Sequence, residues 1–352
     1  MFKEYAILFT PRRFAARYMK KFLLLLLSLL IGIVLFIWIA KMVGWQAIKN
    51  ALLVFTGWHG LVILGLTFLM ALIGTWKWKE ILKGGGVNIS FKKLINPYLA
   101  GFALMFLAPI LIWGGEIFRG YILKERNQVP WSKGMASVII DRILEWTANL
   151  AVIFFGGLFF LLMIDFPPLK LGIIFGGVFL IFLTVVSLFY FKSAKKESII
   201  KFFIRSNQNQ PFEIEKEIFD FFKIKKIAMW KAVSLSFLRA GVMYLRAWVL
   251  ILFLGKSIGG LSALSILGFN YLAVMIPIPT ALGSHEAIQT FAFNSLGLGF
   301  STATAFTMII RGAEIILALF GIIILFRLGI ILIKNTLFKK INNLTKINNT
   351  SL

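Results

Sequence analysis

Ten charged side chains lie in or beside apolar segments of this chain, where they could bind or move other charged groups. The acids are Glu116, Asp141, Glu145, Glu286 and Glu314, and the arginines are Arg119, Arg142, Arg239, Arg246 and Arg311. An unpaired charge in hydrocarbon costs several kcal/mol, so we expect these groups to face one interior cavity and to pair across it.

The residue types point to a particular chemistry. The planar fork of an arginine binds two phosphate oxygens at once, and a carboxylate can bind a cationic group. One interpretation is a polar path for a charged lipid headgroup whose tails stay in the bilayer. The alternative is a set of static ion pairs that hold the helices together. For Glu116 and Glu286 local capping is a third reading, because a carboxylate in the first turn complements the helix dipole.

Two breaks in apolar sequence precede Glu116 and Glu286. Their residues are Pro109, Gly114 and Gly115 in the first break and Pro277, Pro279 and Gly283 in the second. Proline removes a backbone donor and interrupts a helix. Broken backbone at membrane depth persists only where it is buried in protein or lines a wet cavity. We interpret each break as the turn of a re-entrant helical hairpin.

The two breaks belong to a candidate internal repeat. Pro109, Glu116 and Arg142-x-x-Glu145 recur 169 or 170 positions later as Pro279, Glu286 and Arg311-x-x-Glu314. Three expected crossings separate the hairpins, and an odd number would invert the second unit relative to the first. Inverted repeats with broken helices are the design of many secondary transporters. Chance is the alternative explanation for so few matched positions.

Composition sets the class of protein. The 352 residues are 59% hydrophobic with a mean hydropathy of +0.89, which predicts an all-α polytopic membrane protein. The net charge of +24 lies mostly between apolar runs, which favours a cytoplasmic surface facing anionic lipid over a nucleic-acid partner. Without cysteine and with two histidines, no disulfide or histidine-rich metal site is expected, and we expect no cofactor. No catalytic motif is present, so we expect no enzyme activity.

The expected elements are about six full crossings plus the two hairpins, with both termini cytoplasmic at the cell membrane. The crossings are Phe22–Ala40, Trp58–Trp76, Gly134–Ile164, Leu169–Phe191, Ala232–Leu254 and Ser301–Leu325; the hairpins contain Tyr98–Trp113, and Leu261–Pro279 with Gly283–Leu296. Residues 1–21 form a basic cytoplasmic segment, 22–335 the transmembrane domain, 192–231 a cytoplasmic amphipathic segment, and 336–352 a tail that we expect to be disordered from Asn342. Trp45, Trp58, Trp76, Trp78 and Trp131 are interpreted as interface belts.

Three motifs carry a family resemblance: Gly115-Glu116-x-x-Arg119, Asp141-Arg142, and Pro277-x-Pro279 followed by Gly283-x-x-Glu286. In these motifs, and over roughly residues 20–335, the chain resembles the transmembrane-region, flippase-like family of lysylphosphatidylglycerol synthetases. The resemblance implies two re-entrant segments and movement of aminoacylated phospholipids or polyprenyl-linked lipids. The soluble synthase domain of that family has no counterpart here, so lipid synthesis is not implied. Thr280-Ala281 replaces the glycine pair of the family pattern.

The functional expectation is therefore a membrane protein that translocates or binds a lipid with a charged headgroup. The alternatives are a secondary transporter of a small charged solute, a membrane enzyme acting on a lipid-linked substrate, and a scaffold or accessory subunit for lipid-linked glycan synthesis. The expected partners are membrane lipids with an anionic or zwitterionic headgroup, with a homo-oligomer or a separate synthase also open.

Overall fold

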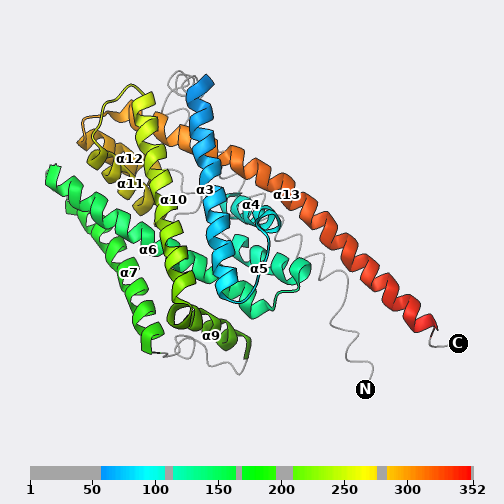
Figure 1. The fold of residues 1–352 in the computed structure, drawn as a ribbon. Coiled ribbons are helices and arrows are strands. Elements are labelled where there is room, and N and C mark those ends of the chain that lie inside the picture. The colour runs from blue at the N-terminus through cyan, green and yellow to red at the C-terminus, as the bar shows by residue number, and fades with distance from the viewer. Residues whose placement is uncertain (1–56, 108–113, 164–168, 196–208, 276–283, 350–352) are drawn as a thin grey trace.

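The structure, a computed structural model, describes residues 57–107, 114–163, 169–195, 209–275 and 284–349 (Figure 1). Within these ranges the chain is helical and has no strand. The helices are α3 (Gly57–Gly84), α4 (Phe91–Leu107), α5 (Gly114–Asn127), α6 (Trp131–Met163), α7 (Leu169–Lys195), α9 (Asn209–Ile224), α10 (Lys226–Phe253), α11 (Gly260–Met275), α12 (Ser284–Ser295) and α13 (Phe300–Asn349).

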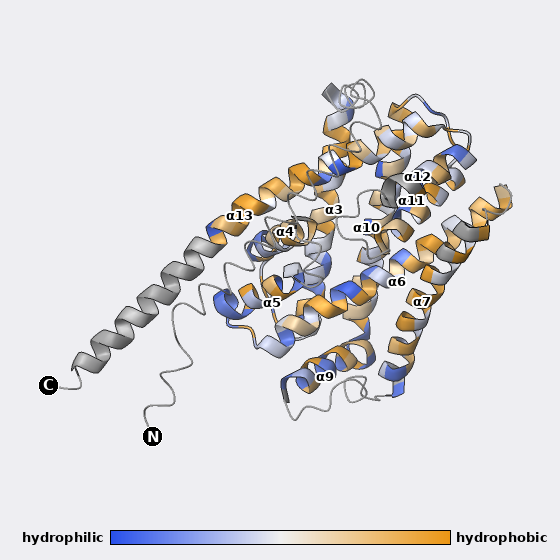
Figure 2. Cartoon of the chain, turned by 180° about the vertical axis from the view of Figure 1, so that it is seen from behind, coloured by the Kyte–Doolittle hydropathy of each residue, from blue (hydrophilic) through white to orange (hydrophobic). Residues whose placement is uncertain are grey.

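Five helices are long and apolar enough to cross a membrane. They are α3, α6 and α10, together with Phe175–Ser193 of α7 and Phe300–Leu328 of α13. Large apolar side chains cover the outside of α6 and α7, including Leu162 and Leu169, which are 74% and 79% exposed (Figure 2). Such a surface requires lipid around it. The chain is therefore a multi-pass membrane protein, and five expected crossings coincide with these helices. The sixth, Phe22–Ala40, lies outside the described residues.

Three helix boundaries differ from expectation. α3 continues to Gly84, so Lys77 and Trp78 belong to a helix rather than to the following loop. α10 begins at Lys226, inside the stretch expected to be an interfacial segment. The backbone of α13 is helical to Asn349, where a disordered tail was expected from Asn342. No proline or glycine follows Gly329, so nothing in the sequence breaks this helix.

Both predicted breaks fall between short helices. α4 ends at Leu107 before α5 begins at Gly114, and α11 ends at Met275 before α12 begins at Ser284. Pro109, Pro277, Pro279 and Gly283 lie outside the described residues. The two arms of the first pair pack closely, because a Cβ on Gly115 of α5 would collide with the carbonyl oxygen of Gly101 on α4. Glycine is needed at this crossing for the close backbone approach.

The helix pattern repeats along the chain. α3 and α10 are both 28 residues long and begin 169 positions apart. The starts of α4 and α11, of α5 and α12, and of α6 and α13 are separated by 169, 170 and 169 positions. α3 packs along α10, and the two helices run in opposite directions (Figure 1). α6 packs on α11 and α13 packs on α4, so corresponding helices make corresponding contacts.

Basic residues gather at one end of the bundle, which we call the basic end. It comprises the ends of α3 and α7, the starts of α6 and α10, and the helix α9 between them (Figure 1). Lys133 at the start of α6 donates to the carbonyl of Gly85, just after α3, at 3.1 Å. α9 lies within the predicted amphipathic segment 192–231 and buries Ile218 and Phe221 against its neighbours. This apolar face packs on the bundle itself.

Candidate functional site

Arg142 on α6 lies between two glutamates. Its Nε donates to Glu116 Oε1 of α5 at 2.6 Å, and its Nη1 donates to Glu145 Oε2 at 3.0 Å. The other oxygen of Glu145 pairs with Arg239 of α10. Glu116 is 4% exposed, and the other three side chains are half-buried. These bonds connect three helices through charges that were identified from the sequence.

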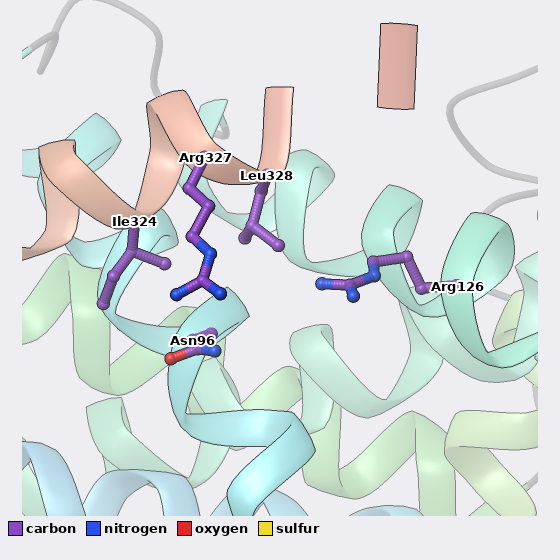
Figure 3. A pocket seen from close by; sticks show the side chains of 5 residues that line it. All are labelled: Asn96, Arg126, Ile324, Arg327 and Leu328. Carbon is purple, nitrogen blue, oxygen red and sulfur yellow. The ribbon is translucent and has the colours of Figure 1, made fainter. Parts of the chain in front are cut away.

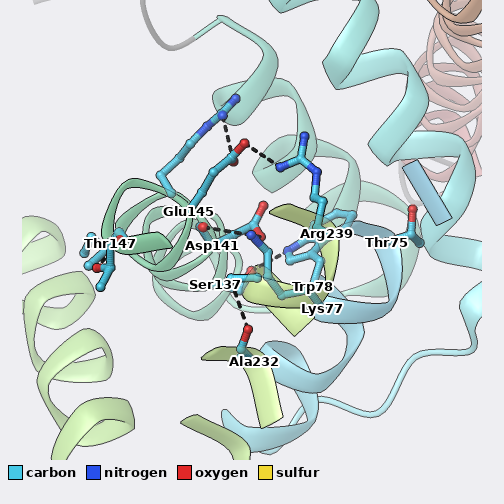
Figure 4. Close-up of polar contacts among 12 residues, drawn as sticks. Thr75, Lys77, Trp78, Ser137, Asp141, Glu145, Thr147, Ala232 and Arg239 are labelled. Atoms are coloured by element: carbon cyan, nitrogen blue, oxygen red, sulfur yellow. Dashed lines mark hydrogen bonds and ion pairs between the residues drawn. The ribbon is translucent and has the colours of Figure 1, made fainter. Parts of the chain in front are cut away.

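Asp141 on α6 is bound by two cations. Lys77 Nζ of α3 lies 2.8 Å from Oδ1, and Arg119 Nη1 of α5 lies 2.8 Å from Oδ2. Figure 4 shows Lys77 extending toward Asp141 and Arg239 meeting Glu145 nearby. Lys77, Asp141 and Arg119 are 1%, 2% and 5% exposed, and groups so deeply buried stay charged only when paired.

Aromatic rings enclose Arg119. Its Cζ lies 4.1 Å from the ring centre of Trp78 and 4.8 Å from that of Tyr98, distances at which a cation is attracted to the ring face. Trp78 Nε1 donates to Ser137 Oγ at 3.0 Å, which fixes the indole. Trp78 is fully buried, so its assignment to an interface belt was wrong, whereas Trp58 and Trp76 are exposed as expected.

We call these seven charged residues the central network. The cations are Lys77, Arg119, Arg142 and Arg239, and the carboxylates are Glu116, Asp141 and Glu145. One positive charge is therefore in excess among the described residues of the network. The buried Nε and Nη2 of Arg119 have no hydrogen-bond partner in the part of the chain that the structure describes. Excess positive charge beside unsatisfied donors favours an anion, although the buried Oε2 of Glu116 in the same network also lacks a hydrogen-bond partner among the described residues.

The space beside the central network is small. A cavity of about 20 Å³ adjoins Tyr98, Met105 and the network, and one of about 10 Å³ lies on the other side of Arg239 near Asn149 and Tyr271. Each has room for about one water molecule. No group of three His, Cys, Asp or Glu side chains in the described part of the chain is placed to hold a metal ion. The charged groups of the network therefore mostly contact one another.

A separate ion pair uses the second half of the chain. Arg246 Nη2 of α10 lies 3.1 Å from Glu314 Oε1 of α13, and its Nη1 donates to Thr67 Oγ1 of α3 at 3.1 Å. Arg246 and Arg239 are seven residues apart on α10, about 10 Å along the helix axis. The structure therefore divides the predicted charges into two groups instead of gathering them at one cavity.

Of the two remaining predicted site residues, the structure describes the side chain of Arg311 but not that of Glu286. Arg311 is half-buried on α13, and the ion pair of its helix neighbour Glu314 is with Arg246. The side chain of Glu286 lies outside the described residues. Close to it in sequence, Gln289 of α12 is buried and donates to Asn270 Oδ1 of α11 at 3.3 Å.

Sequence reasoning missed Lys77, which it placed in a basic loop. The repeat spacing could have identified Lys77 as a site residue. It lies 169 positions before Arg246, and the Arg-x-x-Glu motif recurs at the same spacing. Tyr98 was missed as well, since an aromatic residue in an apolar run carries no pattern of its own. Only the fold brings its ring to Arg119.

Fold and site together define a multi-pass helical membrane protein with a buried, positively biased ionic network. The chain belongs to the family described as the lysylphosphatidylglycerol synthase TM region, whose model matches residues 25–321. The sequence resemblance is thereby confirmed.

Two curated relatives resemble the chain over most of its length. A UPF0104 membrane protein of Methanocaldococcus jannaschii is 24% identical over 295 residues, covering 78% of this chain and 84% of the relative. A UPF0104 membrane protein of Pyrococcus horikoshii is 26% identical over 319 residues, covering 83% and 92%. No solved structure matches the chain significantly.

Proposed function

We propose that this protein binds the phosphate-bearing headgroup of a membrane lipid at the central network and moves it across the bilayer. The observation that carries the proposal is the state of Arg119. Its Nη1 binds Asp141, while its buried Nε and Nη2 have no hydrogen-bond partner among the described residues. Those two nitrogens share one edge of the guanidinium, the edge that can bind two oxygens of a phosphate at once.

The charge balance favours the same ligand. With four cations and three carboxylates among the described residues, the network carries one positive charge in excess. A buried uncompensated charge costs several kcal/mol, and an entering phosphate would remove that cost. A headgroup that carries an amine as well as a phosphate would also find carboxylates, since Glu116 and Glu145 are within the same network.

The small size of the cavity agrees with a cycle in which the protein's own carboxylates bind the arginines between transport events. Glu116 and Glu145 bind Arg142 when no headgroup is present. A headgroup phosphate would replace one of them, and the space of about 20 Å³ would widen as it entered. The short helices α4 and α5, which flank the first break, are the elements best placed to move.

A lipid is favoured over a small solute by the apolar groove between α6, α7 and α11. This groove measures about 810 Å³, and Ile153, Phe175 and Leu272 are among its lining residues. Ile153 lies eight residues from Glu145 on α6, about 12 Å along the axis. Lipid tails could occupy this groove while the headgroup reaches the central network.

The repeated helix pattern supports an inverted repeat, with α4–α5 and α11–α12 as re-entrant hairpins. Inverted units that rock about a central site are a common mechanism of secondary transport. The opposite directions of α3 and α10 agree with this arrangement (Figure 1). By the positive-inside tendency, the basic end would face the cytoplasm of a cell membrane.

The test measures movement of a headgroup-labelled anionic phospholipid across liposomes that contain the full chain. Arg119→Gln should lower the rate about tenfold or more, since charge-assisted hydrogen bonds to one ligand are lost. Arg119→Lys should not restore it, because an ammonium has no two-oxygen edge. Lys231→Gln removes an exposed charge from α10 and should leave the rate unchanged. Wild-type rates for folded Arg119→Gln protein would refute the proposal.

A further inference from the structure

Two arginines from distant parts of the chain meet at a second pocket. Arg126 near the end of α5 and Arg327 on α13 line a space of about 150 Å³ together with Asn96 of α4. Figure 3 shows both guanidinium groups extending toward the same space, with the Asn96 amide beside it. This volume is several times the roughly 10–15 Å³ that one water molecule needs. It is large enough for one tetrahedral anion.

The electrostatics of this pocket are unbalanced. Neither Arg126 nor Arg327 has an ion-pair partner among the described residues, and none of the lining residues is acidic. Glu125, next to Arg126, is exposed and pairs with neither. Like charges that face one space repel each other, and an anion between them would turn that repulsion into attraction. Two forks and an amide are a suitable donor set for phosphate oxygens.

The position of the pocket indicates where the phosphate comes from. Its remaining lining residues are Ile324 and Leu328, and Arg327 is the first charged residue of α13 after Glu314. Ile323 and Phe326 on the same turns of α13 are 66% and 68% exposed, so lipid surrounds this part of the helix. Arg126 lies just before the start of α6, near the basic end. A pocket lined by two arginines, one asparagine and two aliphatic side chains at this position suits a phospholipid headgroup.

We infer that this pocket binds the phosphate of an anionic phospholipid from the leaflet at the basic end, and that the lipid bridges α13 to α4 and α5. The inference does not rest on the proposed function. Its residues are separate from the central network, so a protein that moves no lipid could still retain one here. Such a lipid would stabilise the seam between the two repeated units, because α4 belongs to the first and α13 to the second.

The test is lipid retention by the full chain, measured by native mass spectrometry after purification in equal amounts of phosphatidylglycerol and phosphatidylcholine. The wild type should retain phosphatidylglycerol preferentially. Arg126→Gln combined with Arg327→Gln should lower that retention about tenfold and leave phosphatidylcholine unchanged. Lys223→Gln combined with Lys225→Gln removes two exposed charges near the basic end and should change neither.

Three outcomes would overturn the inference. One is equal retention by wild type and the double arginine variant. Another is an equal loss in the lysine control, which would mean that general surface charge is responsible. The third is displacement of phosphatidylglycerol by low-millimolar inorganic phosphate, which would assign the pocket to a soluble anion. If the double arginine variant folds poorly, the wild type alone still tests the inference: phosphatidylglycerol should raise its unfolding temperature more than phosphatidylcholine does.

Discussion

Lys77 and Arg246 occupy corresponding positions on two packed helices, each twenty residues after the start of a helix of 28 residues. Both side chains are buried, at 1% and 2% exposure. Each binds a carboxylate on the last helix of its own unit, Lys77 to Asp141 on α6 and Arg246 to Glu314 on α13. The two helix patterns therefore share a buried cation at the same position, although the carboxylates that bind it, Asp141 and Glu314, are not at corresponding positions.

The two units differ where the central network gains its extra members. At the spacings of the helix starts, Arg119 corresponds to Gln289 and Asp141 corresponds to Ile310. Both charges of the Arg119–Asp141 pair are thus absent from the second unit. Loss of only one of them would leave the other charge buried without a partner. A lone buried charge is strongly destabilising, so their joint absence is physically reasonable. The asymmetry places the proposed anion site in the first unit.

Removing Lys77 should destabilise the fold. Lys77→Gln leaves Asp141 with Arg119 as its one cationic partner, and breaking a buried pair costs about 3 kcal/mol. The free energy of unfolding in mixed micelles measures the change. Lys79→Gln, on the same helix and half-buried, should change it by less than about 0.5 kcal/mol. Equal stability of the two variants would mean that Lys77 is bound less strongly than its geometry implies.

Arg119 and Asp141 should be energetically coupled. Their oxygen and nitrogen lie 2.8 Å apart in a buried site, so a double-mutant cycle of Arg119→Gln and Asp141→Asn should give about 2 kcal/mol of interaction energy. Unfolding of the wild type, both single variants and the double variant supplies the four values. The same cycle with Lys124→Gln in place of Arg119→Gln should give a value near zero, because Lys124 is exposed on the same helix. Additive effects of Arg119→Gln and Asp141→Asn would contradict the assignment of a direct pair.

Gly115 should not tolerate a methyl group. Gly115→Ala would place Cβ against the carbonyl oxygen of Gly101, and overpacking of this kind costs about 1–3 kcal/mol. Gly241→Ala on α10 is the matched control, because nothing lies within 4 Å of its Cβ position. There alanine should stabilise the helix by about 0.5–1 kcal/mol. Thermal unfolding distinguishes the opposite signs, and stabilisation by Gly115→Ala would mean that α4 and α5 are not closely packed.

The sequence predicted the membrane class, five described crossings and most of the central network. The length of an apolar run is enough to identify a crossing. A charged residue within such a run is easy to recognise because its neighbours are apolar. It did not predict the position of Lys77, because the end of α3 has no proline or capping signal before Gly84. The sequence also could not show that Arg239 and Arg246 join different groups of charges. Two residues that are seven positions apart lie on the same helix face, and this spacing fits either one shared group or two separate groups. Those partners depend on how α3 and α13 pack around α10.

Filling the apolar groove should slow lipid movement without weakening the fold. Gly176 of α7 lines the groove and has nothing within 4 Å of its Cβ position, so Gly176→Leu would occupy space that the proposal gives to a lipid tail. The rate for a long-chain labelled lipid should fall about fivefold, the equivalent of about 1 kcal/mol, which is a little more than the transfer energy of one buried CH₂ group. Gly65→Leu on α3 is a matched control, equally open and outside the groove, and it should leave the rate unchanged. If both variants moved lipid at the wild-type rate, the lipid tails would not use this groove. The binding of the headgroup at Arg119 is tested separately by Arg119→Gln.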